Sequence, residues 1–337
     1  MVFEVRENSQ VGALRRSAVA LAKELDLDDK ASGDVAIAVT EAATNLVKHA
    51  KDGEVLLDPV GDSRRGVRIL ALDRGPGISN LSRALDDGYS SAGSPGNGLG
   101  AILRLSDRFE IHSAPDVGTA LLSEIWADKK ALSNLGPVAV HPQVMVSGIC
   151  LPKPGEPVPG DAWACHNLAT GVSIVMADGL GHGYAAAEAA NEAVRIFKDN
   201  PGEAPATVLQ LIHDALRKTR GAAVALAEID AEKQLVRFAG VGNIAAMILN
   251  GNKSRSFVSH NGIVGHEVRK VQEFSHPLPP DSMLVMHSDG LITHWNLDRY
   301  PGIQSKHPSL IAGLLYRDFA RRRDDVTVVV AKANAQK

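Results

Sequence analysis

Residues 171–183 read GVSIVMADGLGHG, an apolar run that ends in an aspartate and a glycine-rich turn. A short apolar run bounded by turn residues indicates a buried β-strand. The strand VSIVMA would deliver Asp178 at its end, and the glycines that follow allow a sharp change of chain direction. A helical pattern at 185–198 comes next. This stretch therefore predicts a strand, a tight turn that carries an acid, and a helix in immediate succession.

Further aspartates stand in comparable places. Asp161 lies in PGDAW, Asp289 follows the strand pattern MLVM, and Asp324 with Asp325 precedes the last strand pattern in RRRDDVTVVV. Acids gathered at strand ends repel one another, so the arrangement needs a cation, and hard oxygen ligands favour magnesium or manganese. Two such ions could activate a water and clamp a phosphoryl group. One Asp-Gly pair alone is usually a turn former; the whole ordered set argues for a site.

These motifs also carry a family resemblance. The series GD, DGLGHG, GVGN at 240–243, HSDG and DDVT resembles the SpoIIE/RsbX branch of the metal-dependent 2C-class protein phosphatases, over residues 140–332. The resemblance implies an α-β-β-α sandwich with two manganese or magnesium ions, acting on phosphoserine or phosphothreonine in proteins. The ligands that it implies are Asp161, Asp178, Gly179 through its carbonyl, Asp289 and Asp324, with Asp325 as the second choice at the last motif.

His182 lies four residues beyond Asp178, in the turn that enters the next helix. A near-neutral pKa would suit a proton donor to the leaving serine oxygen. A turn histidine that helps to dock the helix explains the residue equally well, and the sequence leaves both interpretations open.

The residues before about 127 mix helices and strands, which predicts a two-layer α+β sandwich. Helical spacing covers 10–25, 34–50 and 98–105, and strand patterns cover 54–60, 67–73, 108–113 and 119–126. Charge, glycine and proline cluster at 128–142, which is the expected linker. The expected phosphatase domain at 143–334 is mostly strands, at 140–151, 160–167, 171–177, 222–230, 235–241, 245–249 and 283–287, with helices at 185–198 and 205–219.

Three patches of the first domain point to a nucleotide. EAATN places Glu41 and Asn45 on one helix face, DRGPG places Asp73 in a turn after a strand, and GNGLG opens a helix. Each signal is weak alone. Together they resemble the Bergerat-type ATPase fold, specifically the RsbT/RsbW serine kinases, over residues 2–126. The motif DGYSSAG at 87–93 strengthens the resemblance to RsbT within that group.

That resemblance implies a role for each position. Asn45 would hold the magnesium of ATP, Asp73 would bind the adenine amino group, and Glu41 would be the base. The other positions would shape the pocket or support the adenine: Gly75, Gly77, Gly98, Gly100 and Thr119. No phosphoacceptor-histidine helix lies upstream and His49 reads as structural, so a two-component histidine kinase is disfavoured.

Composition narrows the class of protein. The chain has 337 residues, a formal charge of -3 and 45% hydrophobic residues, which favours two globular domains and disfavours a nucleic-acid partner. Cys150 and Cys165 lack a metal-type spacing, and neither a signal peptide nor a membrane-spanning run is evident. We therefore expect a cytoplasmic protein without a membrane partner.

The two halves together indicate a regulator of a partner-switching stress pathway. The second domain would dephosphorylate a phosphorylated STAS-domain protein, an anti-sigma antagonist, while the first binds ATP and regulates or phosphorylates the same partner. Two alternatives stay open: a bifunctional serine kinase and phosphatase, and a binding module for a sigma factor. An RsbR/RsbS-like complex is a further candidate partner, and the sequence leaves open whether the nucleotide domain forms a homodimer.

Overall fold

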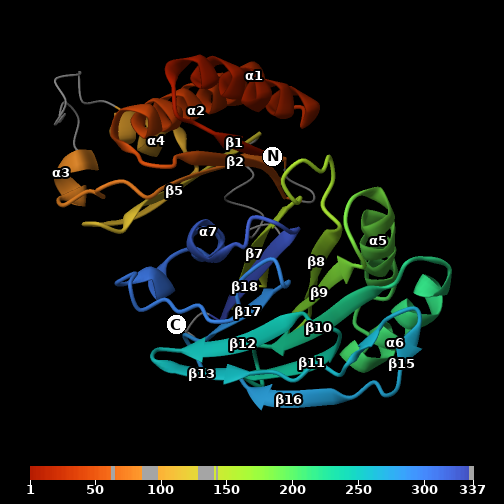
Figure 1. Ribbon diagram of the computed structural model, residues 1–337. Coiled ribbons are helices and arrows are strands. Elements are labelled where there is room, and N and C mark those ends of the chain that lie inside the picture. Colours follow the sequence, from red (N-terminus) through yellow and green to blue (C-terminus); the bar gives the residue numbers. More distant parts are fainter. Residues whose placement is uncertain (62–64, 86–97, 128–139, 142, 334–337) are drawn as a thin grey trace. The chain divides into compact units, whose positions relative to one another are not determined.

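A computed structural model describes residues 1–61, 65–85, 98–127, 140–141 and 143–333 (Figure 1). The expected DGYSSAG motif and most of the expected linker lie outside these residues. The chain forms two compact units, Met1–Val138 with Asn296–Arg317, and Ala139–Trp295 with Asp318–Lys337. The segment 296–317, which the sequence patterns place in the phosphatase domain, therefore folds with the first unit.

The first unit contains a five-stranded antiparallel sheet in the order β1-β2-β3-β5-β4. Its strands are β1 (Val2–Glu4), β2 (Glu54–Val60), β3 (Gly66–Asp73), β4 (Arg108–Ala114) and β5 (Gly118–Trp126). Its helices are α1 (Asn8–Glu24), α2 (Asp29–His49), α3 (Leu81–Leu85) and α4 (Gly98–Leu105), with α7 (Pro308–Phe319) supplied almost wholly from the distant segment. Helix α2 starts earlier than its apolar pattern indicates, because the Asp28 side chain accepts a hydrogen bond from the backbone of Ala31.

Both faces of this sheet are buried. Along β3, Val67, Ile69 and Ala71 belong to the core that α1 and α2 share with the sheet, as the alternation of a strand requires. Leu70 and Leu72 point to the opposite face and are also fully buried. A Cβ at Gly313 of α7 would lie 2.8 Å from Leu70 and 3.1 Å from Leu72. Helix α7 therefore covers the face that the other helices leave open.

The second unit is built from two antiparallel sheets, in the orders β16-β11-β10-β9-β8 and β13-β12-β17-β18-β7-β6. The first sheet comprises β8 (Asp161–Leu168), β9 (Gly171–Gly179), β10 (Ala222–Asp230), β11 (Leu235–Val241) and β16 (Glu273–Pro277). The second comprises β6 (Val140–His141), β7 (Val144–Leu151), β12 (Ala245–Asn250), β13 (Lys253–Ser256), β17 (Met283–His287) and β18 (Val326–Ala333). A short hairpin joins β14 (Gly262–Ile263) and β15 (Glu267–Val268).

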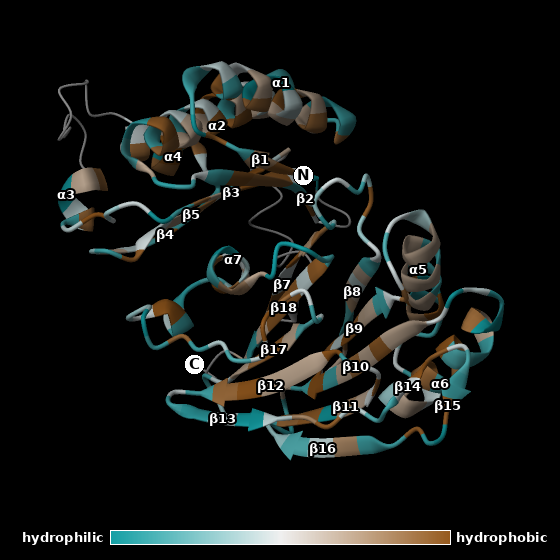
Figure 2. Cartoon of the chain, viewed as in Figure 1, coloured by the Kyte–Doolittle hydropathy of each residue, from teal (hydrophilic) through white to brown (hydrophobic). Residues whose placement is uncertain are grey.

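Helices α5 (Tyr184–Asp199) and α6 (Pro205–Ala215) pack on the first of these sheets, and a 3-10 turn at Leu216–Lys218 extends α6. Figure 2 contrasts the hydrophobic strands inside this unit with hydrophilic β13, an exposed strand at a sheet edge. Together the units confirm the expected α+β class, with sandwiches in both domains. Among the described residues, no helix combines the length and hydrophobicity needed to cross a membrane.

Strand β9 has the expected position and is buried on both faces. Val172, Ile174 and Met176 belong to the core between the two sheets, whereas Val175 and Ala177 pack toward α5 and α6. Because side chains alternate along a strand, Asp178 continues the row that faces the space between the sheets.

Candidate active site and nucleotide pocket

Two of the predicted acids face each other across neighbouring strands. Asp161 of β8 and Asp178 of β9 are register partners in the antiparallel ladder. Asp161 is only 3% exposed. Like charges directly opposite on two strands are destabilising, and burial increases that cost. The fold therefore places two carboxylates where they need either protons or a cation.

The remaining acids, Asp289, Asp324 and Asp325, lie next to strands β17 and β18 of the second sheet. Ser288, which follows β17, donates its backbone N–H to the carbonyl of Thr327 in β18, so the HSDG and DDVT motifs lie side by side. A Cβ at Gly290 would lie 1.9 Å from the carbonyl oxygen of Asp325, so only glycine permits this approach. Asp325, directly before β18, is 4% exposed and lies on the same side of the chain as Thr327, two residues further on. Asp289 and Asp324 lie beside this junction.

The titration of this cluster reflects its crowding. Burial raises the pKa of Asp161 to about 7, opposed by the hydroxyls of Ser288 and Thr327 and increased further by the charges of Asp325 and Asp289. Burial also raises the pKa of Asp178 to about 8, and the charge of Asp161 is the next cause. The acids are therefore close enough to repel one another electrostatically, as the sequence led us to expect.

A bound cation fits the donors that this site presents. The Oδ2 atom of Asp161 is buried without a hydrogen-bond partner, which is costly unless another group binds it. Asp289 and Asp325 do have protein partners. Asn243 donates to Asp289 over 2.8 Å, and the backbone N–H of Lys153 donates to Asp325 over 2.8 Å. Within the described residues, no three acids, histidines or cysteines converge as a ready-made metal ligand set.

His182 has a partner that the sequence did not reveal. Its Nδ1 lies 2.7 Å from Oε1 of Glu156, and the two side chains are 50% and 26% exposed. Glu156 sits in the loop PGEPVPG, whose glycines and prolines give no periodic signal that would mark it as functional. Asn243 belongs to the GVGN motif, which contributed to the family resemblance but did not by itself indicate a function for Asn243.

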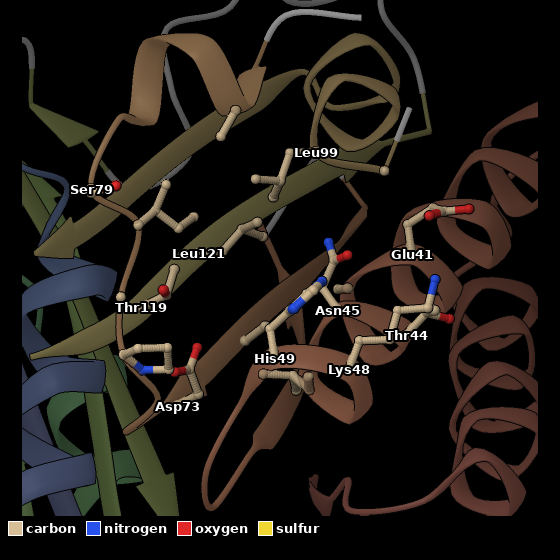
Figure 3. Close-up of a pocket in the computed structure, with 18 of the residues that line it drawn as sticks. Glu41, Thr44, Asn45, Lys48, His49, Asp73, Ser79, Leu99, Thr119 and Leu121 are labelled. Atoms are coloured by element: carbon tan, nitrogen blue, oxygen red, sulfur yellow. The ribbon is translucent and has the colours of Figure 1, made fainter. Parts of the chain in front are cut away.

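The first unit holds a cavity of about 530 Å³ between α2, the β3 end and α4 (Figure 3). Glu41 and Asn45 line it from one face of α2, as their spacing predicts. Four other predicted residues line it too: Asp73, Gly77, Gly98 and Thr119. Gly75 and Gly100 are not part of the lining. The sequence did not single out several further lining residues: Thr44, Lys48, Ile78, Leu99 and Leu121. His49, read as structural, also borders the cavity.

The polar groups of this cavity suit a nucleotide. The Nδ2 atom of Asn45 is buried without a partner. A Cβ at Gly98 would lie 3.1 Å from the Glu41 carboxylate and 3.4 Å from Asn45, so this close approach favours glycine. Gly75 donates its backbone N–H to Asp73 over 2.6 Å and thereby orients the carboxylate. Burial raises the pKa of Asp73, while the Gly75 N–H, Arg317 and Thr119 oppose that shift.

Comparison with known proteins identifies the family of each domain. The model of the histidine kinase-like ATPase domain matches residues 4–123, and that of Stage II sporulation protein E (SpoIIE) matches residues 169–334. The serine/threonine-protein kinase RsbT of Bacillus subtilis (strain 168) is 33% identical over 107 residues, which is 32% of this chain and 80% of that protein. The chain belongs to the RsbT-like ATPases, joined to a SpoIIE-type phosphatase domain.

Other relatives match the SpoIIE-type domain. The phosphoserine phosphatase RsbX of Bacillus subtilis (strain 168) is 24% identical over 189 residues, or 54% of this chain and 91% of that protein. A solved structure from work on the bacterial stressosome has a TM-score of 0.51 at 28% identity, covering 56% of this chain and 98% of its own. RsbX in complex with magnesium has a TM-score of 0.50 at 21% identity, covering 58% and 97%, which shows the shared fold. The expected class, a metal-dependent protein phosphatase, is confirmed.

Proposed function

We propose that the SpoIIE-type domain hydrolyses phosphoserine or phosphothreonine on a STAS-domain protein of a partner-switching pathway, using two manganese or magnesium ions. The observation that carries the proposal is the pair Asp161 and Asp178, opposed on adjacent strands with one buried oxygen unpartnered. Crowded oxygen donors of this kind suit hard divalent cations. RsbX, a phosphoserine phosphatase by name, supports the substrate class.

The proposed ligands are Asp161, Asp178, the Gly179 carbonyl, Asp289 and Asp324, with Asp325 as the second choice at the last motif. The ions, when bound, would acidify a water and neutralise the phosphoryl charge. The chain's own acids hold that centre between the sheets, where burial strengthens electrostatic interactions. Asn243 restrains Asp289 through a hydrogen bond, and so orients it beside the junction of β17 and β18.

The test is manganese-dependent phosphate release from a phosphoserine STAS protein by the full chain. Asp178→Asn and Asp289→Asn should each lower kcat by at least about 100-fold, because each removes one anionic ligand. Asp281→Asn is the matched control, since this exposed turn aspartate precedes β17 outside the site. Hydrolysis that survives both site substitutions would contradict the proposed metal centre.

We infer for the RsbT-like domain that its cavity binds ATP with magnesium. Asn45 would hold the magnesium through its side-chain oxygen, and Asp73 would accept the adenine amino group. The unpartnered Asn45 amide and the close approach of Gly98 to α2 support this assignment. The same partner protein is the expected docking target.

A second activity is favoured by Glu41, which borders the cavity close to Gly98. In that position a carboxylate could accept a proton from an attacking serine hydroxyl, which would make the chain a bifunctional kinase and phosphatase. Labelled ATP should then transfer phosphate to a STAS partner in an Asp289→Asn background, where the product persists. Glu41→Gln should abolish the label, whereas Glu24→Gln at the exposed end of α1 should not. If the Asp289→Asn variant transfers no label to the STAS partner, the RsbT-like domain would have an ATP-sensing role and no kinase activity.

A further inference from the structure

The loop that carries Glu156 is tied to the acid cluster. Lys153 donates its backbone N–H to the Asp325 carboxylate over 2.8 Å, and the backbone N–H of Glu156 donates to the Lys153 carbonyl over 2.9 Å. The turn therefore fixes the backbone of Glu156 three residues after Lys153, the residue that contacts the last acidic motif. The position of the Glu156 side chain therefore depends on the fold of the site.

The turn around His182 is equally constrained. Gly181 and Gly183 have φ values of 96° and 71°, a region that other residues rarely adopt, so the backbone direction at His182 is set by the two glycines beside it. A Cβ at Gly183 would lie 2.8 Å from Oε2 of Glu156. Gly183 is also the N-cap of α5 and supplies no side-chain cap. The Glu156 carboxylate thus lies at the start of a helix, where the helix dipole favours a negative charge.

Stability does not account for the pair. Ion pairs that are exposed to this degree contribute about 0–1 kcal/mol. The geometry does have a chemical consequence. A carboxylate 2.7 Å from Nδ1 accepts its hydrogen and fixes the orientation of the ring, while Nε2 of His182 has no protein partner among the described residues.

We propose that Glu156 is a positioning residue that orients His182 as the proton donor to the leaving serine oxygen. The inference rests on the proposed phosphatase function. A water oxygen forms the new bond to phosphorus and releases one proton to solvent. The bond from phosphorus to the serine oxygen breaks, its electron pair stays on that oxygen, and the oxygen takes the Nε2 proton of His182. His182 then regains a proton from solvent, and the products are a serine hydroxyl and inorganic phosphate.

Leaving groups of different basicity test this role. A serine alkoxide needs a proton as it departs, whereas nitrophenolate leaves unaided. With the manganese-loaded full chain, Glu156→Gln should lower kcat for a phosphoserine protein by about 10–100-fold at unchanged KM, and by less than about 3-fold for p-nitrophenyl phosphate. His182→Gln should show the same selectivity, and the double variant should lose little more than either single one.

Two comparisons exclude a general structural effect. Glu188→Gln, at an exposed glutamate of α5, should change the kcat for neither substrate. Glu156→Asp should recover part of the phosphoserine activity, since it keeps the carboxylate. In ¹⁵N spectra, the His182 ring should carry its proton on Nδ1 in the unsubstituted protein when neutral, and both tautomers should appear in Glu156→Gln.

The outcomes separate the inference from the function on which it rests. Equal losses on both substrates, or no loss on either, would overturn the role of Glu156 while the phosphatase activity stands. An unsubstituted chain that hydrolyses neither substrate with manganese would instead contradict the phosphatase proposal.

Discussion

Asp161 and Asp178 are the residues whose protonation has the largest expected effect on the metal-free protein. Folding raises the pKa of each carboxyl from its ordinary value of 3.8, to about 7 for Asp161 and about 8 for Asp178. Between about pH 4 and pH 8 the folded state therefore binds more protons than the unfolded state, so the stability that these two groups contribute is largest below about pH 4 and falls as the pH rises toward 8. In urea titrations with a chelator, we expect the free energy of unfolding to be about 1–3 kcal/mol lower at pH 8 than at pH 6. Manganese should remove this decline, and a stability that rises with pH would contradict it.

A substitution at Asp178 should separate stability from activity. Asp178→Asn removes one of the opposed charges, so the metal-free protein at pH 8 should gain about 1–3 kcal/mol while manganese-dependent hydrolysis is lost. Thermal melts with a chelator measure the first effect and phosphate release the second. Asp281→Asn should change neither quantity. A lower melting temperature of the Asp178→Asn variant without metal would mean that the acid is paired rather than strained.

Single residues also mark the limit of what the sequence could predict. The positions of the acids followed from their motifs, because strand-end placement is a local pattern. Their partners did not, since the contacts of Asn243 with Asp289 and of Glu156 with His182 join segments that are distant along the chain. The cavity residues show the same division. Glu41 and Asn45 share a helix face and were found, whereas Leu99 and Leu121 enter from other elements.

At the scale of elements, the sequence predicted short apolar strands bounded by turn residues and missed a helix that is buried on every side. Strands β10 and β17 and helix α4 have the predicted bounds, because turn residues delimit them clearly. Helix α7 was not predicted. All ten residues from Pro308 to Arg317 are buried, so PSLIAGLLYR shows no polar face from which a helical period could be recognised. Strand β16 was missed for a different reason, since EFSHP is short and mostly polar.

Two glycines in helices should respond in opposite directions. At Gly33 in α2, an added Cβ meets nothing within 4 Å, so Gly33→Ala should stabilise the protein by about 0.5–1 kcal/mol through helix propensity. At Gly313 in α7, the same atom would already lie 2.8 Å from Leu70, so Gly313→Val should destabilise it by about 1–3 kcal/mol. Chemical unfolding of both variants measures the contrast. Equal effects at the two positions would mean that α7 does not pack closely on β3.

At the scale of the whole molecule, one stretch of chain belongs to the fold of the other domain. Segment 296–317 leaves the phosphatase domain between Asp289 and Asp324 and folds with the first unit. There, the Arg317 guanidinium donates to the backbone carbonyls of Asp73 and Val117, the former at the adenine end of the proposed pocket. His307 donates its backbone N–H to Glu110 of β4 over 2.8 Å. The boundary between the two units therefore does not fall at a single point of the sequence, which composition alone could not indicate.

This arrangement predicts that the RsbT-like domain is incomplete when the chain is cut after residue 138. Without α7, the β3 face that carries Leu70 and Leu72 would be open to water, and exposed apolar patches of this kind promote association. We expect fragment 1–138 to aggregate on size-exclusion chromatography and to bind a hydrophobic dye. The same fragment with 296–317 appended through a flexible linker should be monodisperse and should bind an ATP analogue more tightly.

Arg317→Met in the appended segment should weaken that binding without restoring aggregation, because it removes the two hydrogen bonds but keeps the apolar cover. A monodisperse fragment 1–138 that binds the nucleotide as well as the linked form would show that α7 is dispensable for this domain.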